Sequence, residues 1–338
     1  MLKAVRLNAI TYPVDQAERD ELARASVELI AVEGQQPDEI IAAAADCDAL
    51  LVVSSRVPAD VIERLTRCRT IARLGAGTDR IDVAAATRCG IVVSNVPDFC
   101  LSEQADHTLA LLLASVRRLP FMTEALRRGD WSARHHPGVH RLAGQTLGLI
   151  GFGASAQAVA ERAAAFKLRL IAWTRTPDRH RAAAAALGVE LVALDDLLAR
   201  SDFVSIHLPL TGDTRHLLSA EQLARMKRSA SLVNTARGAI VDEAALVDAL
   251  RSGKIAGAAL DVFEHLDVFA LPGPPPNHPL IGLDNVILTP HCAGSSVESS
   301  AESKRRGAQN AADVLLGRWP RHVVNSEVSP RFDLQRPG

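Results

Sequence analysis

The stretch TLGLIGFGASAQAVAERAAAF, residues 146–166, decides the fold of this chain. A short apolar run at residues 146–150 leads into Gly-Phe-Gly-Ala-Ser-Ala at 151–156, and an Ala-rich amphipathic segment follows. This is the G-x-G-x-x-G/A pattern between a strand and a helix, which is the context that the motif requires. The stretch therefore predicts a dinucleotide-binding βαβ unit.

Each small residue of the motif has a physical role. Gly151 allows the tight turn from strand to helix, Gly153 lets the backbone approach a pyrophosphate, and Ala156 keeps the helix close to the sheet. The free amides of the first helical turn, at Ala154 and Ser155, would donate to the anion. We expect all five residues to contact the cofactor.

Outward from the motif, short β-branched runs alternate with Ala- and Leu-rich helical stretches, which is typical of parallel sheets covered by helices. Before the motif, strands are expected at residues 3–8, 27–32, 50–54, 70–74 and 91–94, with helices at 15–25, 37–45 and 59–65. From the motif onward, strands are expected at residues 146–150, 169–173, 190–192, 203–207, 231–234, 257–261 and 286–288.

Two long helical patterns divide the chain. Residues 102–118 should form a helix that begins at Ser102 as N-cap and links two domains, and residues 296–316 should form a helix that carries the chain back. A length of 338 residues is too great for one ordinary core. We expect an α/β protein with a flavodoxin-like substrate domain (1–101 and 297–338) and a doubly wound Rossmann domain (102–296).

Composition narrows the class of partner. The chain has 38 Lys plus Arg and 39 Asp plus Glu, a net charge of −1, so no global field favours nucleic acid or an anionic membrane. No window approaches the apolar length of a membrane helix, and the N-terminus lacks a signal-peptide core. A cytoplasmic protein with a small-molecule partner is expected. The five cysteines lack zinc spacing and are interpreted as reduced packing residues: Cys47, Cys68, Cys89, Cys100 and Cys292.

The end of the second strand of the βαβ unit bears on the choice of cofactor. An NAD site usually places a carboxylate there for the ribose 2′-hydroxyl, whereas Arg accommodates a 2′-phosphate. Thr174 occupies the position, 18 residues after Ala156, and Arg175 and Thr176 follow. With no carboxylate at that position and Arg175 able to bind a phosphate, we favour NADP(H), with NAD(H) as the alternative.

A series of motifs in order along the chain resembles the D-isomer-specific 2-hydroxyacid dehydrogenase family, which includes glyoxylate/hydroxypyruvate reductases and phosphoglycerate dehydrogenases. Besides the glycine motif, the segments that carry the resemblance are RLGAGTDRID (73–82), ADHTLALLLA (105–114), SDFVSIHLPLTGDTRHLL (201–218), MKRSASLVNTARGAIVDEAAL (226–246), GAALDVFE (257–264) and NVILTPHCAG (285–294).

The resemblance implies roles for particular residues. Arg237, in NTARG, matches the arginine that orients the substrate, and His291, in TPHCAG, matches the acid/base histidine. Asp261 matches the contact to the nicotinamide amide. The backbone of Leu74, Gly75, Ala76 and Gly77 matches the loop that receives the substrate carboxylate, and further cofactor contacts are implied at Pro209, Thr214, Thr235 and Ala236.

One expected residue is missing. The family pattern places a glutamate five residues after Asp261, where it pairs with the histidine, but this chain has Leu266 there. Glu264 matches a different, non-catalytic position, and Asp267 lies one residue too far unless the loop shifts. Loss of the carboxylate should leave His291 less basic. Three explanations remain open. Asp267 takes the place of the glutamate through a shift of the loop, the enzyme works without this carboxylate at a lower pH optimum, or catalysis has been lost.

The function implied is hydride transfer between NADPH and a small 2-keto acid, such as glyoxylate or hydroxypyruvate, in a crevice between the two domains of a homodimer. The alternative is a dinucleotide-binding regulator, because residues 97–114 are similar to the C-terminal-binding-protein branch of the family. We expect no metal, since Pro137-Gly138 breaks the spacing of His135, His136 and His140.

Overall fold

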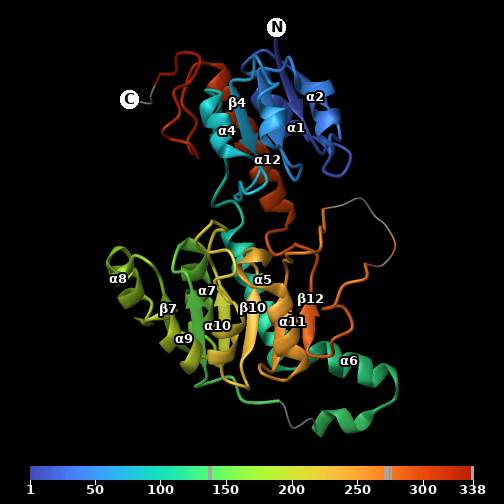
Figure 1. The fold of residues 1–338 in the computed structure, drawn as a ribbon, viewed down its shortest axis with the longest axis vertical. Coiled ribbons are helices and arrows are strands. Elements are labelled where there is room, and N and C mark those ends of the chain that lie inside the picture. Colours follow the sequence, from blue (N-terminus) through green and yellow to red (C-terminus); the bar gives the residue numbers. More distant parts are fainter. Residues whose placement is uncertain (136–138, 270–273, 275, 336–338) are drawn as a thin grey trace. The chain divides into compact units, whose positions relative to one another are not determined.

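The structure is a computed structural model that describes residues 1–135, 139–269, 274 and 276–335. The chain divides into two compact units (Figure 1). Unit 1 comprises Met1–Phe99 with the residues from Ser296 onward, and unit 2 comprises Cys100–Ser295. No helix in the described ranges combines the length and apolar character needed to cross a membrane.

Unit 1 contains a five-stranded parallel sheet in the order β2-β1-β3-β4-β5, which is the flavodoxin-like order. Its strands are β1 (Leu2–Arg6), β2 (Val27–Ala31), β3 (Ala49–Val52), β4 (Thr70–Arg73) and β5 (Val92–Ser94). Its helices are α1 (Gln16–Ala23), α2 (Pro37–Ala44), α3 (Ala59–Ile62), α4 (Val83–Arg88) and α12 (Val297–Leu315).

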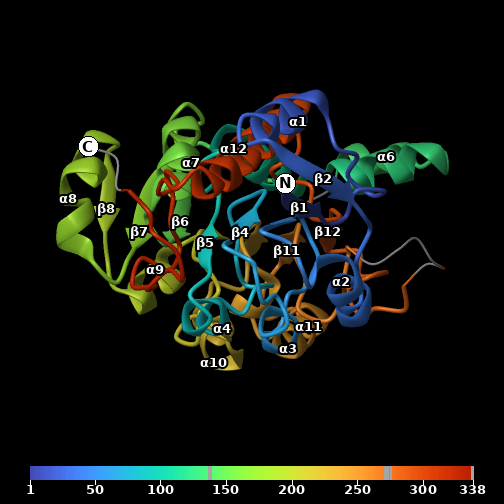
Figure 2. The same ribbon diagram turned by 90° about the horizontal axis from the view of Figure 1, so that it is seen from above.

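Helices cover both faces of this sheet (Figure 2): α1 and α12 pack on one face, and α2, α3 and α4 on the other. The buried face of α12 is built from small residues, including Ala308 and Ala311. A Cβ at Gly307 would lie 2.7 Å from Cγ of Leu74, so glycine lets this helix approach the sheet closely. Beyond α12, the chain returns to β5, where the N–H of Val324 donates to the carbonyl of Val93 at 2.8 Å.

Unit 2 contains a seven-stranded parallel sheet in the order β12-β11-β10-β9-β6-β7-β8. Counted from β6, this is the Rossmann order 3-2-1-4-5-6 with one more strand at the edge. The strands are β6 (Thr146–Ile150), β7 (Arg169–Trp173), β8 (Val189–Leu191), β9 (Phe203–Ile206), β10 (Ser231–Asn234), β11 (Gly257–Leu260) and β12 (Val286–Leu288). The expected fold class, a doubly wound Rossmann sheet together with a flavodoxin-like sheet, is confirmed.

Two apolar clusters sandwich the unit 2 sheet, one on each face. One cluster includes residues of α5, α7 and α8, and the other includes residues of α9, α10 and α11 (Figure 1). The helical elements of this unit are α5 (Leu101–Val116), α6 (Leu119–Arg127), η1 (Trp131–His135), α7 (Ala154–Ala164), α8 (Pro177–Ala186), α9 (Leu194–Arg200), α10 (Ala220–Arg225), η2 (Gly238–Ile240) and α11 (Glu243–Arg251).

The expected N-cap of the long helix α5 is wrong. The helix begins at Leu101 with Cys100 at the cap, so Ser102 lies inside its first turn. The Ser102 hydroxyl instead accepts a hydrogen bond at 2.8 Å from Arg162, which also contacts Asp106 at 2.6 Å. Ser102 therefore links α5 to α7 and does not cap its own helix.

Candidate active site

The glycine turn lies at the carboxyl end of β6, where the strand order of the sheet reverses between β6 and β9. Gly151 has φ +93°, and a Cβ there would lie 2.3 Å from the His207 carbonyl oxygen, so only glycine fits. Gly153 caps α7 in an extended conformation, and a Cβ there would meet no atom within 4 Å. The open side of this turn and the amides of the first turn of α7 fit a pyrophosphate at the switch point of a doubly wound sheet.

A surface cavity of about 330 Å³ lies beyond the carboxyl end of β7. It is lined by residues of β7, α8 and the β8–α9 connection: Trp173, Thr174, Pro177, Leu191, Val192 and Ala193. Thr174, expected from its distance to the glycine motif, forms part of this lining. Its hydroxyl accepts the N–H of Thr176 at 3.4 Å. The cavity suits the adenosine end of a dinucleotide, which is the end that carries the 2′-hydroxyl or 2′-phosphate.

Arg175 has a partner that sequence spacing did not show. Its Nη1 lies 2.9 Å from Oδ2 of Asp213, and both side chains are exposed. The sequence places no carboxylate at the position of Thr174, but the fold brings one to Arg175 from the loop after β9. A bound 2′-phosphate would compete with Asp213 for this guanidinium.

The loops after β9 and β10 are held by their own side chains. The Thr214 hydroxyl donates to the Pro209 carbonyl at 2.7 Å, which brings these two expected cofactor residues together. After β10, the Thr235 hydroxyl lies 2.9 Å from that of Thr108, and the Ala236 N–H donates to Oδ1 of Asn234 at 3.0 Å. Thr214, Thr235 and Ala236 are buried, so these contacts shape the edge of the sheet.

Arg237 follows β10 in extended conformation, immediately before η2. Its Nη1 donates to the carbonyl of Ala236 at 2.7 Å, and its own carbonyl accepts from Asn234 Nδ2 at 2.9 Å. A Cβ at the next residue, Gly238, would lie 2.0 Å from the carbonyl carbon of Phe263. Because residue 238 is glycine, the turn that carries Arg237 (the Arg237 turn) packs directly on the segment that follows β11.

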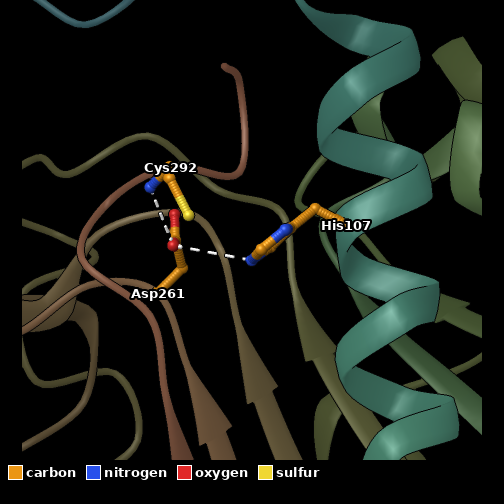
Figure 3. A group of neighbouring side chains, drawn as sticks. All are labelled: His107, Asp261 and Cys292. Atoms are coloured by element: carbon orange, nitrogen blue, oxygen red, sulfur yellow. Dashed lines mark hydrogen bonds and ion pairs between the residues drawn. The ribbon is translucent and has the colours of Figure 1, made fainter. Parts of the chain in front are cut away.

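Asp261 organises the loop that carries His291 and Cys292, and Figure 3 shows its carboxylate beside Cys292. Its carboxylate is 1% exposed and accepts the Thr289 hydroxyl at 2.6 Å and the N–H groups of Cys292 and Ala293, both at 2.9 Å. The His291 N–H donates to the Asp261 carbonyl at 2.9 Å. These bonds surround His291, which has φ +55°, an uncommon conformation for a residue with a side chain.

His107 on α5 was missed by the sequence reasoning. Its Nε2 lies 3.1 Å from the Thr289 hydroxyl and 3.6 Å from Oδ1 of Asp261, so it joins the same network (Figure 3). The available signal was the spacing of three polar residues at i, i+3 and i+4, which places Gln104, His107 and Thr108 on one face of the helix.

In the described ranges, His107, Asp261 and Cys292 also form a group of three potential metal ligands. The Asp261 oxygens already accept three hydrogen bonds, and burial together with that carboxylate raises the pKa of the Cys292 thiol, which keeps it protonated. The chemistry of this group favours a hydrogen-bonded loop over a metal centre. Of the three histidines considered above, His136 lies outside the described residues, and His135 accepts from Arg134 at 3.0 Å.

An aromatic ring lies near the position where the family pattern has its glutamate. The ring centroids of Phe269 and His291 are 4.7 Å apart. Asp267 is exposed, and its carboxylate accepts the N–H of Phe269 at 3.0 Å. Leu266 is partly buried. The substitution of Asp267 for the missing glutamate stays a hypothesis.

The Leu74–Gly77 segment of unit 1 has an asymmetric hydrogen-bond pattern. Arg73 donates to the carbonyls of Leu74 and Gly77 at 2.6 and 3.0 Å, Val96 N–H donates to Gly75, and Asn95 donates to Ala76. In the part of the chain that the structure describes, the N–H groups of residues 75–77 donate to no acceptor. Consecutive amides of this kind suit an anion.

Comparison with known proteins assigns the family. A family model described as "D-isomer specific 2-hydroxyacid dehydrogenase, NAD binding domain" matches residues 109–293. The chain belongs to this family. It is 42% identical to a glyoxylate reductase of Aeropyrum pernix over 309 residues, which cover 89% of each chain.

Two further relatives differ in length and in named activity. The chain is 41% identical to a D-3-phosphoglycerate dehydrogenase of Methanocaldococcus jannaschii, covering 89% of this chain but only 56% of the relative. A solved acyclic imino acid reductase in complex with NADPH and D-Arg superposes with a TM-score of 0.83 and 28% identity, over 96% of this chain and all of the other.

Family and fold together establish the general activity. The chain is an oxidoreductase that acts on CH–OH donors, with the function of an NAD(P)-dependent 2-hydroxyacid dehydrogenase. It uses a nicotinamide cofactor, for which the glycine turn and the neighbouring cavity fit. No observation favours the regulatory alternative.

Proposed function

We propose that this protein reduces small 2-keto acids, such as glyoxylate or hydroxypyruvate, with NADPH. The observation that carries the proposal is that four elements of the site follow strands of one parallel sheet, three of which are adjacent. Gly151 follows β6, Arg237 follows β10, Asp261 follows β11 and His291 follows β12. Parallel strands place their carboxyl ends at the same edge, which is where doubly wound folds bind ligands.

Each residue at this edge of the sheet has a separate role in the proposed reaction. The reduced nicotinamide, when bound, supplies hydride to the carbonyl carbon of the substrate. Arg237 binds the planar carboxylate and polarises the carbonyl, because a guanidinium offers paired donors in a fixed geometry. His291 donates the proton that the nascent alkoxide oxygen requires. Asp261 holds the His291 loop and retains acceptor capacity on Oδ2 for the nicotinamide amide.

The unpaired amides of Gly75, Ala76 and Gly77 are proposed as a second anion-binding element, for the substrate carboxylate. All four carbonyls of the Leu74–Gly77 segment are held by donors of unit 1, so its backbone presents donors and not acceptors. This polarity suits a carboxylate. In this proposal unit 1 acts as the substrate domain.

NADP(H) is the proposed cofactor. Its support is Arg175, which lies beside the residues that line the cavity at the end of β7. A guanidinium forms strong charge-assisted hydrogen bonds with phosphate, whereas the exposed pair with Asp213 is a weak competitor. The structurally similar imino acid reductase, solved with NADPH, agrees with this choice.

We further propose a homodimer formed through unit 2. Helix α6 and η1 extend away from the sheet of that unit (Figure 1), and they expose Leu119, Leu126 and Trp131 by 52%, 56% and 69%. Large apolar side chains gathered on one projecting segment are typical of an interface. A second copy of the chain is the proposed partner.

The test of the activity is NADPH oxidation, followed by absorbance, with glyoxylate, hydroxypyruvate, pyruvate and phenylpyruvate from about pH 5 to 8. His291→Ala is the control for the proton donor. Turnover that rises toward acidic pH and disappears in the control supports the proposal. NADPH binding without turnover of any of these acids, at any pH, rejects it.

A further inference from the structure

A chain of hydrogen bonds in unit 2 connects the glycine turn to the Arg237 turn. It begins at Gln104 on α5, whose Nε2 donates to the carbonyl of Thr235 at 2.9 Å. A backbone carbonyl only accepts hydrogen bonds, so this contact determines which end of the amide faces which way. Oε1 of Gln104 therefore faces Ser155.

The next bond follows from that orientation. Oγ of Ser155 lies 2.9 Å from Oε1 of Gln104, and this oxygen has no hydrogen to give. Ser155 must donate, and its single hydroxyl proton is then used. Its other partner, Nδ1 of His207 at 3.0 Å, must carry a hydrogen and donate to Ser155.

The chain of hydrogen bonds ends at Ser205, in β9. His207 is buried, and burial lowers its pKa to about 4, so the ring is neutral near pH 7. A neutral ring with a proton on Nδ1 has none on Nε2. Nε2 therefore accepts the hydroxyl proton of Ser205 at 2.8 Å.

Two parts of this chain of hydrogen bonds lie in the proposed site: its middle, at Ser155, and its end at Thr235. Ser155 is in the first turn of α7, whose amides face the proposed pyrophosphate position, and the backbone of His207 packs against Gly151. At its end, Thr235 lies two residues before Arg237. Thr108 supports the same junction, because its hydroxyl contacts both the Gln104 carbonyl at 2.7 Å and the Thr235 hydroxyl at 2.9 Å.

We propose that Gln104 and His207 are positioning residues that hold the glycine turn, which would bind the pyrophosphate, and the Arg237 turn at a fixed position relative to each other. Neither residue touches the reacting atoms. Gln104 connects Ser155 to Thr235, and His207 fixes the proton of Ser155 in the direction of Gln104. The functional part rests on the proposed function, whereas the proton arrangement does not.

The arrangement of protons is tested first, on the wild-type chain without cofactor. Side-chain 15N–1H NMR of the histidines between pH 6 and 8, assigned with His207→Asn, reports the tautomer directly. We expect His207 to be neutral with the proton on Nδ1. A proton on Nε2, or a charged ring at pH 6, would overturn the proposal whatever the enzyme does.

The coupling is tested by NADPH affinity, measured from nucleotide fluorescence, so that no turnover is needed. Gln104→Met keeps the side-chain length and removes both amide contacts. We expect it to bind NADPH about tenfold more weakly than the wild type. Part of the His207 population should also carry its proton on Nε2, since Ser155 is then free to donate to Nδ1. Wild-type affinity in Gln104→Met would show that the chain does not position the turn.

A pair of substitutions at His207 separates positioning from packing. The amide nitrogen of Asn occupies the place of Nδ1, so His207→Asn should bind NADPH within about twofold of the wild type, whereas His207→Leu, with no donor, should lose about tenfold. Equal losses in both variants would contradict the proposal. Ser201→Ala, which removes a buried hydroxyl that donates to the Leu197 carbonyl of its own helix segment, is the matched control and should bind normally.

These outcomes remain distinguishable from failure of the proposed function. A protein that shows the Nδ1 tautomer and the predicted affinity pattern, but reduces no 2-keto acid, would retain the positioning chain and lose the substrate assignment. If Gln104→Met does not fold, as judged by circular dichroism, the wild-type tautomer and the His207 pair still decide the matter.

Discussion

The ring of Phe269 lies against the imidazole of His291, with centroids 4.7 Å apart and planes inclined at 53°. Asp267 holds the turn that carries this ring by accepting the N–H of Phe269. An apolar ring therefore packs on the proposed proton donor close to where the family pattern has a carboxylate. We therefore expect the pH range of catalysis to depend on whether residue 266 carries a negative charge.

Replacing Leu266 with Glu restores a carboxylate at the position of the family's glutamate. A nearby negative charge favours the protonated form of a histidine, so reduction should persist to higher pH. We expect the alkaline limb of kcat/KM for 2-keto acid reduction to move upward by about one pH unit. The measurement is the pH–rate profile, with Leu266→Gln as the uncharged control of the same length. An unmoved profile in Leu266→Glu would mean that the missing carboxylate does not set the pH range.

The pair of Arg175 and Asp213 predicts opposite effects on cofactor choice. Arg175→Ala should reduce the preference for NADPH over NADH about tenfold, through loss of charge-assisted hydrogen bonds to the 2′-phosphate. Asp213→Asn should strengthen NADPH binding roughly threefold, because it removes an exposed competitor for the guanidinium. Fluorescence titration with both nucleotides measures the ratios. A wild type without preference for NADPH would refute the cofactor assignment.

Gly238 is expected to tolerate no side chain. A Cβ would overlap the backbone of Phe263, so Gly238→Ala must displace either the segment that follows β11 or the Arg237 turn. We expect a loss of about 1–3 kcal/mol in the free energy of unfolding and a large drop in kcat/KM. Urea unfolding and steady-state kinetics measure the two effects. Gly212→Ala is the control, since a Cβ there would meet nothing within 4 Å, and it should match the wild type in both.

The buried His207 predicts a pH dependence of stability. It binds a proton near pH 6.5 when unfolded but only near pH 4 when folded, so between these values the unfolded state holds more protons. The contribution is complete above pH 6.5 and is lost as the pH falls through 4. Between pH 7 and 5, the wild type should lose about 2 kcal/mol more than His207→Asn. Urea unfolding at both pH values tests this, with the exposed His135→Asn as control. Parallel losses in all three proteins would contradict it.

The exposed apolar residues of α6 and η1 predict the oligomeric state. The wild type should sediment at twice its chain mass of 36.1 kDa, and Leu126→Asp with Trp131→Asp should sediment as a monomer. Ile10→Asp changes an even more exposed apolar residue of unit 1 and should leave the mass unchanged. A monomeric wild type would reject the proposed dimer, and a dimeric double variant would place its interface elsewhere.

Local sequence was sufficient for the architecture because its signals are local. Hydrophobic runs predicted the strands of both sheets to within a few residues, and Gly151, Gly153 and Ala156 predicted the cofactor turn from steric requirements alone. Errors occurred where a distant side chain intervened. Ser102 looked like an N-cap, but Arg162 of another helix takes its hydroxyl.

By itself, the sequence determined the two sheets and the glycine turn, because local patterns encode them. Its resemblance to the family pointed to Arg237, His291 and Asp261 as candidate site residues, because each lies within a motif of neighbouring residues. Only the tertiary structure decided which groups meet across long sequence separations: Asp213 with Arg175, Gln104 with Ser155 and Thr235, and Phe269 with His291. Such pairings depend on which strands and helices become neighbours when the sheet assembles. The physical reason is that hydrogen bonds and ring contacts act over a few ångströms in space, and no pattern within a single segment encodes them.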